Sequence, residues 1–431
     1  MRHRVVLGAA IAGLTAAPLA LALDFGRSAD VAVGRQPTAI APLYVDDDDH
    51  TDLVTANAAA PGLSLLLGNG DGTFRPRIDI SDAGPARGIT VADFNSDGLD
   101  DVAVANVTGN SVSLLLGNGA TLVPGGRFPV GASPQAVVSD DLDSDGNQDL
   151  VTANGAPPDK GVSVLLGLGD GTFTEPDVYG TRTRAQSVAV TDMDVDGIVD
   201  LVSTDSSANT VSFLIGTGEG TFEDAVTSRP IGARPWAVTP GGSGVYVAAL
   251  GGSGGAGGGI YFVTYGDDPP SRIEVGKSPG SVLVDDLDLD GRDDVLAALP
   301  LSREVVVKTG EGTLLRRRVG AAPSMAVLAD LNEDGAADIA VANRGSASVS
   351  VLLNGVAATP GRPSCVVPRL LGRTVPAARP ILTASRCTVG RVTRRWARAR
   401  RGRIVAQRPQ AGTRLPTGAS VALTVSRGPR R

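Results

Sequence analysis

Histidine, cysteine and aromatic side chains are scarce in this chain. Its 431 residues include two histidines and two cysteines, and aromatic residues make up 3% of the total. The sequence has neither a G-x-S-x-G motif nor a glycine-rich phosphate loop in a strand–helix context. Because nucleophilic catalysis needs an activating base beside the nucleophile, these absences argue against an enzyme. The 56 glycines instead favour a turn-rich β protein over a helical bundle.

Acidic residues are absent from the last part of the chain. Residues 356–431 contain seventeen arginines and no Asp or Glu, whereas residues 23–355 hold 20 basic and all 46 acidic residues, a charge of −26. A single mixed globule rarely sorts its charges in this way, so the sequence predicts two domains. We place them at residues 23–355 and 365–431, joined by a linker at residues 356–364.

A hydrophobic leader precedes the first domain. The basic start MRHR is followed by the uncharged stretch Val5–Leu23 and by the small-x-small sequence Ala20-Leu21-Ala22. This pattern predicts a secretory signal peptide at residues 1–22. An uncleaved anchor helix is the alternative, but glycine, proline and many alanines make the stretch weakly hydrophobic. We therefore expect a secreted protein with no membrane contact after cleavage.

The two cysteines, Cys365 and Cys387, both lie in the basic domain. An even pair of cysteines in an exported protein predicts a disulfide bond. A metal site made of the two thiolates is less favoured, because no histidine lies nearby in the sequence.

The acidic region repeats itself. Five similar segments, among them DFNSDGLDDVAVAN and DLDSDGNQDLVTAN, begin at Asp93, Asp141, Asp192, Asp286 and Asp330. With a weaker sixth copy, the last Asp of each loop falls at Asp52, Asp101, Asp149, Asp200, Asp294 and Asp338. The gaps are 49, 48, 51, 94 and 44 residues. Since 94 is twice 47, one unit near Trp236–Leu250 has lost its loop, and seven units result.

Each unit offers about four short strands, and a sheet that small cannot bury both of its faces alone. Seven such sheets around an axis can, so we predict an all-β, seven-bladed propeller. The seventh unit ends near Asn354 without a fourth strand. The segment Phe25–Gly34 precedes the first complete unit and resembles the missing strand. We therefore expect this N-terminal segment to close the last blade.

The intact loops have the spacing D-x-[DN]-x-D-G-x-x-D. Oxygens at positions 1, 3, 5 and 9 converge when the backbone curls tightly, and the glycine at position 6 permits the positive φ of that curl. Such hard oxygen cages suit Ca²⁺ better than Mg²⁺, so we predict about five structural calcium sites. Solvated turns are the alternative. The expected side-chain ligands are Asp93, Asn95, Asp97, Asp101, Asp141, Asp143, Asp145, Asp149, Asp192, Asp194, Asp196, Asp200, Asp286, Asp288, Asp290, Asp294, Asp330, Asn332, Asp334 and Asp338.

The first unit departs from this pattern. Its loop has Tyr44 at position 1 and Asp49 where the glycine belongs. We expect weak metal binding there or none. His50 is expected to be a surface turn residue and not a catalytic base. The loops are not EF-hands, because position 12 is never Glu and no helix is expected beside them.

With SVSLLLGNG and GDGTF after the acidic loop, the units resemble the FG-GAP/VCBS repeats of integrin-α-like propellers. The resemblance covers residues 25–355. It implies one Ca²⁺ per intact loop and a role in adhesion or extracellular ligand binding. It further implies that the backbone carbonyl at position 7 is a ligand, which adds Leu99, Asn147, Ile198, Arg292 and Ala336.

The basic domain is expected to place one helix, preceded by Thr374, on three strands near residues 388–394, 403–407 and 420–426. Its segments VPRLLG, QRPQAGTRLPTG and VALTVSRG resemble a PASTA domain. The resemblance implies binding to peptidoglycan. One departure is Pro380, which should kink the helix. The arginines suit peptidoglycan or another anionic cell-wall polymer, or form a solvated face; with one aromatic, Trp396, specific nucleic-acid binding is unsupported.

Taken together, these features predict a secreted, calcium-binding adhesion or ligand-binding propeller, attached non-covalently to the bacterial cell wall. The propeller's ligand would be a protein or a glycan. The alternative is an extracellular polysaccharide-active enzyme, a glycosidase or lyase on a propeller scaffold. A ligand site on the propeller is first sought in the eroded unit, near Trp236, Tyr246, Tyr261 and Tyr265. The equal alternative is that this repeat has drifted in sequence without gaining a site.

Overall fold

The computed structural model describes most of residues 23–355 and 364–427. The residues outside the description are 1–22, 28, 47, 49, 60–61, 82, 157–160, 182–183, 224–226, 233, 253–256, 267, 289, 335, 356–363, 368–369, 372, 386–387, 396–401, 409–413, 417–419 and 428–431. The predicted signal peptide lies outside the described residues, as does Cys387. The signal peptide and the disulfide therefore stay predictions.

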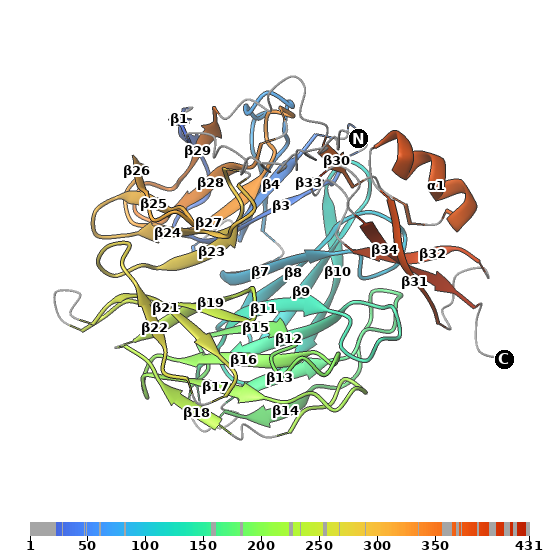
Figure 1. Ribbon diagram of the computed structural model, residues 1–431, viewed down its shortest axis with the longest axis horizontal. Coiled ribbons are helices and arrows are strands. Elements are labelled where there is room, and N and C mark those ends of the chain that lie inside the picture. Colours follow the sequence, from blue (N-terminus) through green and yellow to red (C-terminus); the bar gives the residue numbers. More distant parts are fainter. Residues whose placement is uncertain are drawn as a thin grey trace, which may run out of the picture.

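Seven antiparallel sheets form a ring of blades (Figure 1). Blades one to three contain β3 (Pro37–Leu43), β4 (Asp52–Asn57), β5 (Leu63–Leu66) and β6 (Ile78–Ile80); β7 (Ala86–Ala92), β8 (Asp101–Asn106), β9 (Ser111–Gly117) and β10 (Leu122–Pro129); and β11 (Pro134–Asp140), β12 (Asp149–Asn154), β13 (Gly161–Leu165) and β14 (Asp177–Gly180). Blades four and five contain β15 (Ser187–Thr191), β16 (Asp200–Asp205), β17 (Thr210–Leu214) and β18 (Thr227–Pro230); and β19 (Pro235–Gly241), β20 (Gly244–Ala249), β21 (Gly259–Thr264) and β22 (Ser271–Ile273). Blades six and seven contain β23 (Ser281–Asp285), β24 (Asp294–Leu299), β25 (Glu304–Lys308) and β26 (Leu314–Arg318); and β27 (Pro323–Ala329), β28 (Asp338–Asn343) and β29 (Ser348–Asn354), joined by β1 (Phe25–Arg27) and β2 (Val31–Ala32).

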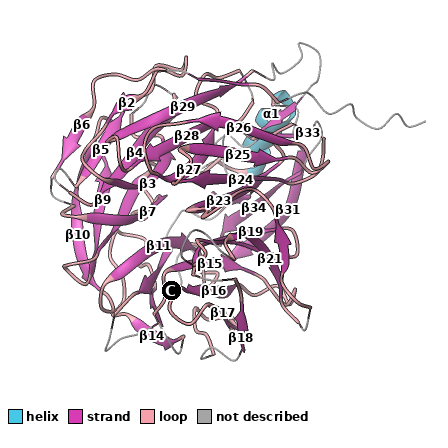
Figure 2. Cartoon of the chain, turned by 90° about the vertical axis from the view of Figure 1, so that its left-hand side faces the viewer, coloured by secondary structure: helices cyan, strands magenta, loops and turns pink. Residues whose placement is uncertain are grey.

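The first strand of each blade is the innermost. The strands β3, β7, β11, β15, β19, β23 and β27 each contact the next around the ring, and β27 contacts β3 again (Figure 2). The second strands carry sequences such as DVAVAN and DLVTAN, and in six blades every residue of this strand is buried. Small and β-branched side chains fill both faces of these strands, because neighbouring blades pack on both sides.

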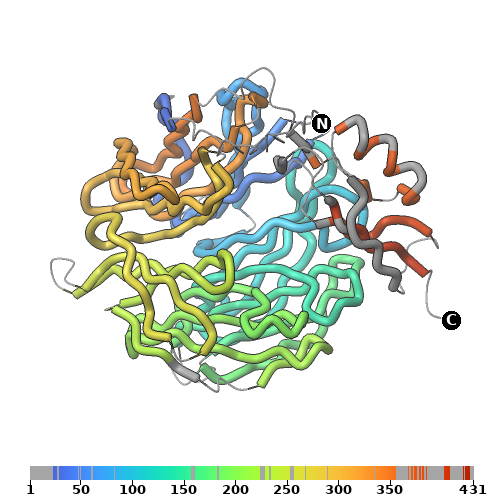
Figure 3. Tube along the Cα trace, in the orientation of Figure 1, coloured from blue at the N-terminus to red at the C-terminus, as the bar shows by residue number. Residues whose placement is uncertain are grey.

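The chain termini of the propeller meet in blade seven, as predicted. Strand β1 pairs antiparallel with β29, with Phe25 opposite Asn354, and β2 pairs with the same strand further along. Phe25 is 2% exposed and packs in the core between blades six and seven. Figure 3 shows the blue N-terminal segment beside the orange seventh blade. The ring is therefore closed by hydrogen bonds between its two ends.

Blade five confirms the predicted unit with an eroded loop. Strands β19 and β20 pair directly up to Gly241 opposite Gly244, so only two residues connect them. The intact blades have eight-residue connections at this point, for example between Ala92 and Asp101. The blade itself is retained, since its strands still pack against both neighbours.

The C-terminal region forms a small α+β unit, as predicted. Its elements are β30 (Ser364–Val366), α1 (Val375–Ala384), β31 (Thr388–Arg395), β32 (Ile404–Arg408), β33 (Arg414–Pro416) and β34 (Ser420–Ser426). Strand β34 lies between β31 and β32, and β30 pairs with β33. Helix α1 begins directly after Thr374, whose carbonyl accepts a hydrogen bond from the Ala378 amide. Within the described part of the chain, no helix has the length and apolar character needed to cross a bilayer.

Candidate metal centres

The acidic loops occupy equivalent places in six blades. Each loop joins the innermost strand to the second strand, and its last Asp is the first residue of that second strand. These aspartates are fully buried: Asp52, Asp101, Asp149, Asp200, Asp294 and Asp338 are each at most 1% exposed. The repeat thus places six loops at the same end of the ring.

The last Asp of each loop holds the turn together through both carboxylate oxygens. In blade two, Asp101 Oδ2 accepts a hydrogen bond from the Phe94 amide at 2.8 Å, and Oδ1 accepts one from the Gly117 amide at 2.9 Å. The same pair of bonds recurs in the other five loops. Each oxygen keeps a second lone pair, so this Asp can bracket the loop and still face a cation.

The second donor to this Asp lies at or just after the end of the third strand, and it is a glycine in five of the six loops and Asn354 in blade seven. A Cβ at Gly117 would overlap the Asp100 carbonyl oxygen, and one at Gly216 would overlap the Val199 carbonyl oxygen. At these two positions glycine therefore permits a close approach to the backbone just before the buried Asp.

Two residues adopt positive φ in each loop of blades two, three and four. The predicted one is the glycine at position 6, with φ of 97° at Gly98 and 90° at Gly197. The residue at position 4 does the same without being glycine, with φ of 60° at Ser96 and 64° at Val195. No sequence pattern marks this second position, because serine, valine and glutamate all occur there.

The remaining oxygens turn inward. In blade two, Asp93 Oδ2 accepts the Gly98 amide at 2.9 Å, and Asp97 Oδ1 accepts the Leu99 amide at 2.8 Å. Asn95 accepts the Asp97 amide and donates to an Asp97 oxygen, both at 2.9 Å. These bonds hold the side chains at positions 1, 3 and 5 in one concave turn, as their spacing predicted.

Four clusters of carboxylates have ligand atoms that all lie within 4.8 Å of one another. They are Asp46, Asp48 and Asp52; Asp141, Asp143 and Asp149; Asp192, Asp194 and Asp200; and Asp286, Asp288 and Asp290. Each of these groups has the donor type and convergence that a hard divalent cation requires. In blades two and seven the residue at position 3 is Asn95 or Asn332, an amide oxygen in place of a carboxylate.

The crowded carboxylates resist ionisation in the absence of a cation. Burial raises the pKa of Asp149 to about 8, although hydrogen bonds from the Gly167 and Leu142 amides oppose the rise. Burial likewise raises the pKa of Asp101 and of Asp338 to about 7. Neighbouring loop carboxylates add to these shifts through repulsion. A bound cation would reverse the sign of that local potential.

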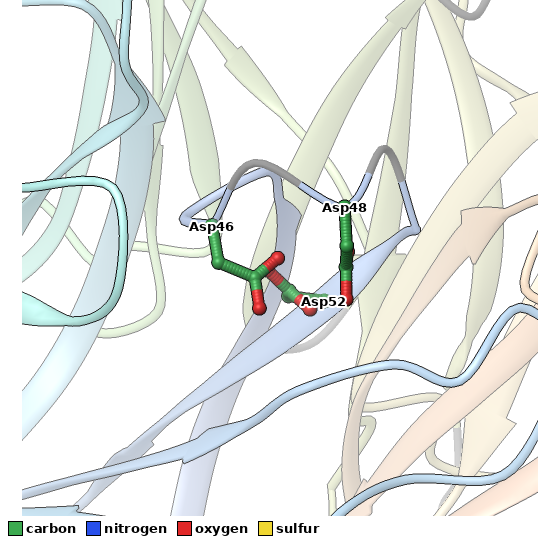
Figure 4. A group of neighbouring side chains, drawn as sticks. All are labelled: Asp46, Asp48 and Asp52. Carbon is green, nitrogen blue, oxygen red and sulfur yellow. The ribbon is translucent and has the colours of Figure 1, made fainter.

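In the first loop, a positively charged side chain of the protein itself contacts the carboxylates. The guanidinium of Arg75 contacts Asp46 at 3.1 Å and also contacts Asp48. Figure 4 shows Asp46, Asp48 and Asp52 turned toward one another. Arg75 directly follows GDGTF, where the third, fourth and sixth units have Thr174, Glu223 and Leu315. Arg75 was not identified from the sequence. Its ion pairs with the loop carboxylates agree with the expectation of weak metal binding in this loop, and that expectation stays a prediction.

His50 links two blades. Its Nδ1 forms an ion pair with Glu333, which lies in the acidic loop of blade seven. The hydrogen bond to Glu333 raises the pKa of His50. Its role in the described structure is therefore an interblade contact at a turn.

The GDGTF turns connect the acidic loop of one blade to the next blade through hydrogen bonds. The Gly72 amide of blade one donates to the Leu331 carbonyl in the loop of blade seven at 2.8 Å. The Gly171 amide of blade three donates to the Phe94 carbonyl in the loop of blade two at 3.1 Å. Each such turn thus docks on the acidic loop of the preceding blade, so loop order and blade packing are coupled.

This ring of seven antiparallel sheets, with acidic loops at one end and docking turns between blades, defines the protein as a repeat-built β-propeller. Sequence comparison assigns the repeats and the last domain. The FG-GAP-like repeat matches residues 45–104, 93–152 and 141–203, and the PASTA domain matches residues 366–427. The chain is therefore a seven-bladed β-propeller with FG-GAP-like repeats and a C-terminal PASTA domain. The loops of blades six and seven lie outside the matched residues but have the same bracketing bonds.

Solved structures share the fold at low identity. BBS1N, solved in complex with ARL6DN, is 13% identical, with a TM-score of 0.58, and 78% of this chain and 98% of that chain are covered. Virginiamycin B lyase from Staphylococcus aureus is also 13% identical, with a TM-score of 0.53 and coverage of 76% and 99%. The WD40 propeller of Doa1 is 10% identical, with a TM-score of 0.54 and coverage of 76% and 97%. No curated protein sequence matches the chain. These neighbours include an enzyme and a partner-binding domain, so the likeness shows the fold alone.

Proposed function

We propose that this protein is a secreted, calcium-binding propeller that binds an extracellular ligand and is attached non-covalently to the bacterial cell wall by its PASTA domain. The observation that carries the proposal is the combination of repeated oxygen-lined loops with a PASTA domain in one chain. Both kinds of module are typical of extracellular proteins, and calcium is abundant outside the cell.

Calcium is the cation that the loops fit best. Each intact loop offers oxygens at positions 1, 3, 5 and 9, and the carbonyl at position 7 completes an irregular cage. Ca²⁺ accepts six to eight oxygens in flexible geometry, whereas Mg²⁺ demands an octahedron and keeps several waters. We therefore assign one structural Ca²⁺ to each loop of blades two, three, four, six and seven.

The proposed metal stabilises the ring and takes no part in catalysis. It would neutralise carboxylates whose mutual repulsion raises their pKa, and it would fix the loop on which the next blade docks. A metal that binds only the folded state adds its binding free energy to the free energy of unfolding. Calcium would therefore control the stability of the propeller.

The C-terminal domain is proposed to supply attachment. It contributes arginines and no acidic residue to a protein whose propeller carries a large negative charge. Guanidinium groups pair well with carboxylates and phosphates, which are the charged groups of peptidoglycan and of other anionic wall polymers. This leaves the propeller free for a separate ligand.

Co-sedimentation with purified bacterial cell wall at physiological salt tests the attachment. The full mature chain is compared with a version that ends at Gly361, each in calcium and in chelator, after thermal unfolding has shown that the shorter version folds. We expect the full chain alone to pellet, with or without calcium. Pelleting of the shorter version in calcium would place wall binding in the propeller, and pelleting of neither would contradict attachment.

A further inference from the structure

The innermost strands carry a bulge at the end opposite the acidic loops. In blades one, two, three, five and seven, the pairing register shifts after the first residue of the inner strand. Bulges re-aim a side chain, and here the shifts begin at the residue after Pro37, Ala86, Pro134, Pro235 and Pro323. The bulged residues are Thr38, Arg87, Gln135, Trp236 and Ser324, which surround one mouth of the propeller axis.

Three of these side chains are used by the fold. Thr38 donates to the Ala56 and Ala86 carbonyls, each at 3.1 Å, and so ties blade one to blade two. Ser324 donates to the Pro37 carbonyl at 2.9 Å and ties blade seven to blade one. Gln135 donates to the Ser133 carbonyl at 2.8 Å. For the other two side chains, Arg87 and Trp236, the described structure shows no hydrogen bond of this kind.

Arg87 and Trp236 meet across the axis. They come from blades two and five, on opposite sides of the ring, and the guanidinium carbon of Arg87 lies 5.5 Å from the centre of the Trp236 ring. Both side chains are partly buried. No ion pair joins Arg87 to a carboxylate among the residues that the structure describes. A stacked guanidinium uses its face for the ring and keeps its edge, with its N–H donors, free.

The electrostatics of this mouth favour an anion. Burial lowers the pKa of Arg87, and the charge of Arg344 adds to the effect. Arg344 follows β28, at the same end of the blades as Arg87. A partly buried cation that faces a second cation gains most from a ligand that brings negative charge.

We propose that Arg87, Trp236 and Arg344 form an axial site for a carboxylate-bearing ligand, with the carboxylate bound to the free edge of the Arg87 guanidinium. The planar fork of arginine matches a planar carboxylate through two parallel hydrogen bonds. This proposal specifies the class of ligand that the propeller binds, and it rests on the ligand-binding function proposed above. It lies at the opposite end of the inner strands from the acidic loops.

Fluorescence of the full chain tests this site directly. The sequence has two tryptophans, so the Trp396→Phe variant reports on Trp236 alone. The calcium-loaded variant is titrated with a sugar acid, glucuronate, against its neutral match glucose. A second titration uses a peptide carboxylate, N-acetyl-alanyl-alanine, against its amide, and a third uses inorganic phosphate.

We expect a saturable change in Trp236 emission with at least one carboxylate and with neither neutral match. Arg87→Met should raise the Kd at least tenfold, and Arg87→Lys should raise it less. Arg318→Met, which removes an exposed arginine on the outer strand β26, should leave the Kd unchanged. Wall pelleting by the Arg87 variants should also be unchanged, which separates this site from wall attachment.

Binding of no carboxylate, or of phosphate alone, would overturn the proposal. So would an unchanged Kd in both Arg87 variants. If Arg87→Met fails to fold, Arg87→Lys keeps the charge and tests the bidentate geometry on its own.

Discussion

The buried loop carboxylates predict an unusual coupling between pH and calcium. The pKa of Asp149 is about 8 in the folded, metal-free chain, against an ordinary value of 3.8. A raised folded pKa means that the folded state holds a proton that the unfolded state has released, so metal-free stability falls as pH rises from about 4 toward 8. At about 1.4 kcal/mol per pKa unit, this one group accounts for about 6 kcal/mol across the window.

Calcium should act in the opposite direction. A ligand carboxylate must lose its proton before it binds the metal, so the stabilisation by calcium should grow as pH rises. We expect metal-free protein to unfold at a lower temperature at pH 8 than at pH 5, and calcium to remove most of this difference. Thermal unfolding followed by circular dichroism, with metal-free and calcium-loaded samples at each pH, measures both effects.

Two variants isolate the cause. Asp149→Asn removes one titrating group and should flatten the pH dependence of the metal-free chain. His50→Gln removes a group of another kind, whose raised pKa also lowers stability as pH rises. Metal-free stability that increases from pH 5 to pH 8, or a calcium effect of equal size at both values, would refute the reasoning.

Three further predictions concern the ring and its loops. Deletion of residues 23–34 removes the pairing of β1 and β2 and the burial of Phe25, so the midpoint of urea unfolding should fall by the equivalent of about 4 kcal/mol; an unchanged midpoint would contradict ring closure by this segment. The double variant Tyr44→Asp with Arg75→Thr restores the ligand at position 1 and removes the internal cation, so equilibrium dialysis should find one more bound calcium than in the wild type. Val195 is a β-branched residue with φ of 64°, and since Asn tolerates this conformation better, Val195→Asn should stabilise the protein by about 1 kcal/mol; a lower melting temperature would show that the strain is absent.

The architecture was largely predictable because the repeat imposes it. The spacing of the last Asp counted the blades, including the one without a loop, and the incomplete seventh unit identified the strand that closes the ring. The positions of the loop side chains followed from the motif, since the same curl recurs in each copy.

The contacts between blades could not be predicted. The docking of Gly72 and Gly171 on neighbouring loops joins residues that lie far apart along the chain, and no local pattern encodes it. Arg75 and Arg87 were missed for a related reason, because each is a single arginine at a repeat position that other units fill differently. The carboxylates of the first loop meet Arg75 through the folding of blade one, and Trp236 meets Arg87 only in the closed ring.

The most direct test of the account is the number of calcium ions bound by the folded mature chain. Metal-free protein is dialysed against millimolar calcium, and bound metal is measured against protein concentration. The account predicts about five ions per chain, reduced by about one in an Asp192→Ala variant and unchanged in an Asp46→Ala variant. A folded chain that binds no calcium would contradict it, and so would loss of an ion on substitution of Asp46.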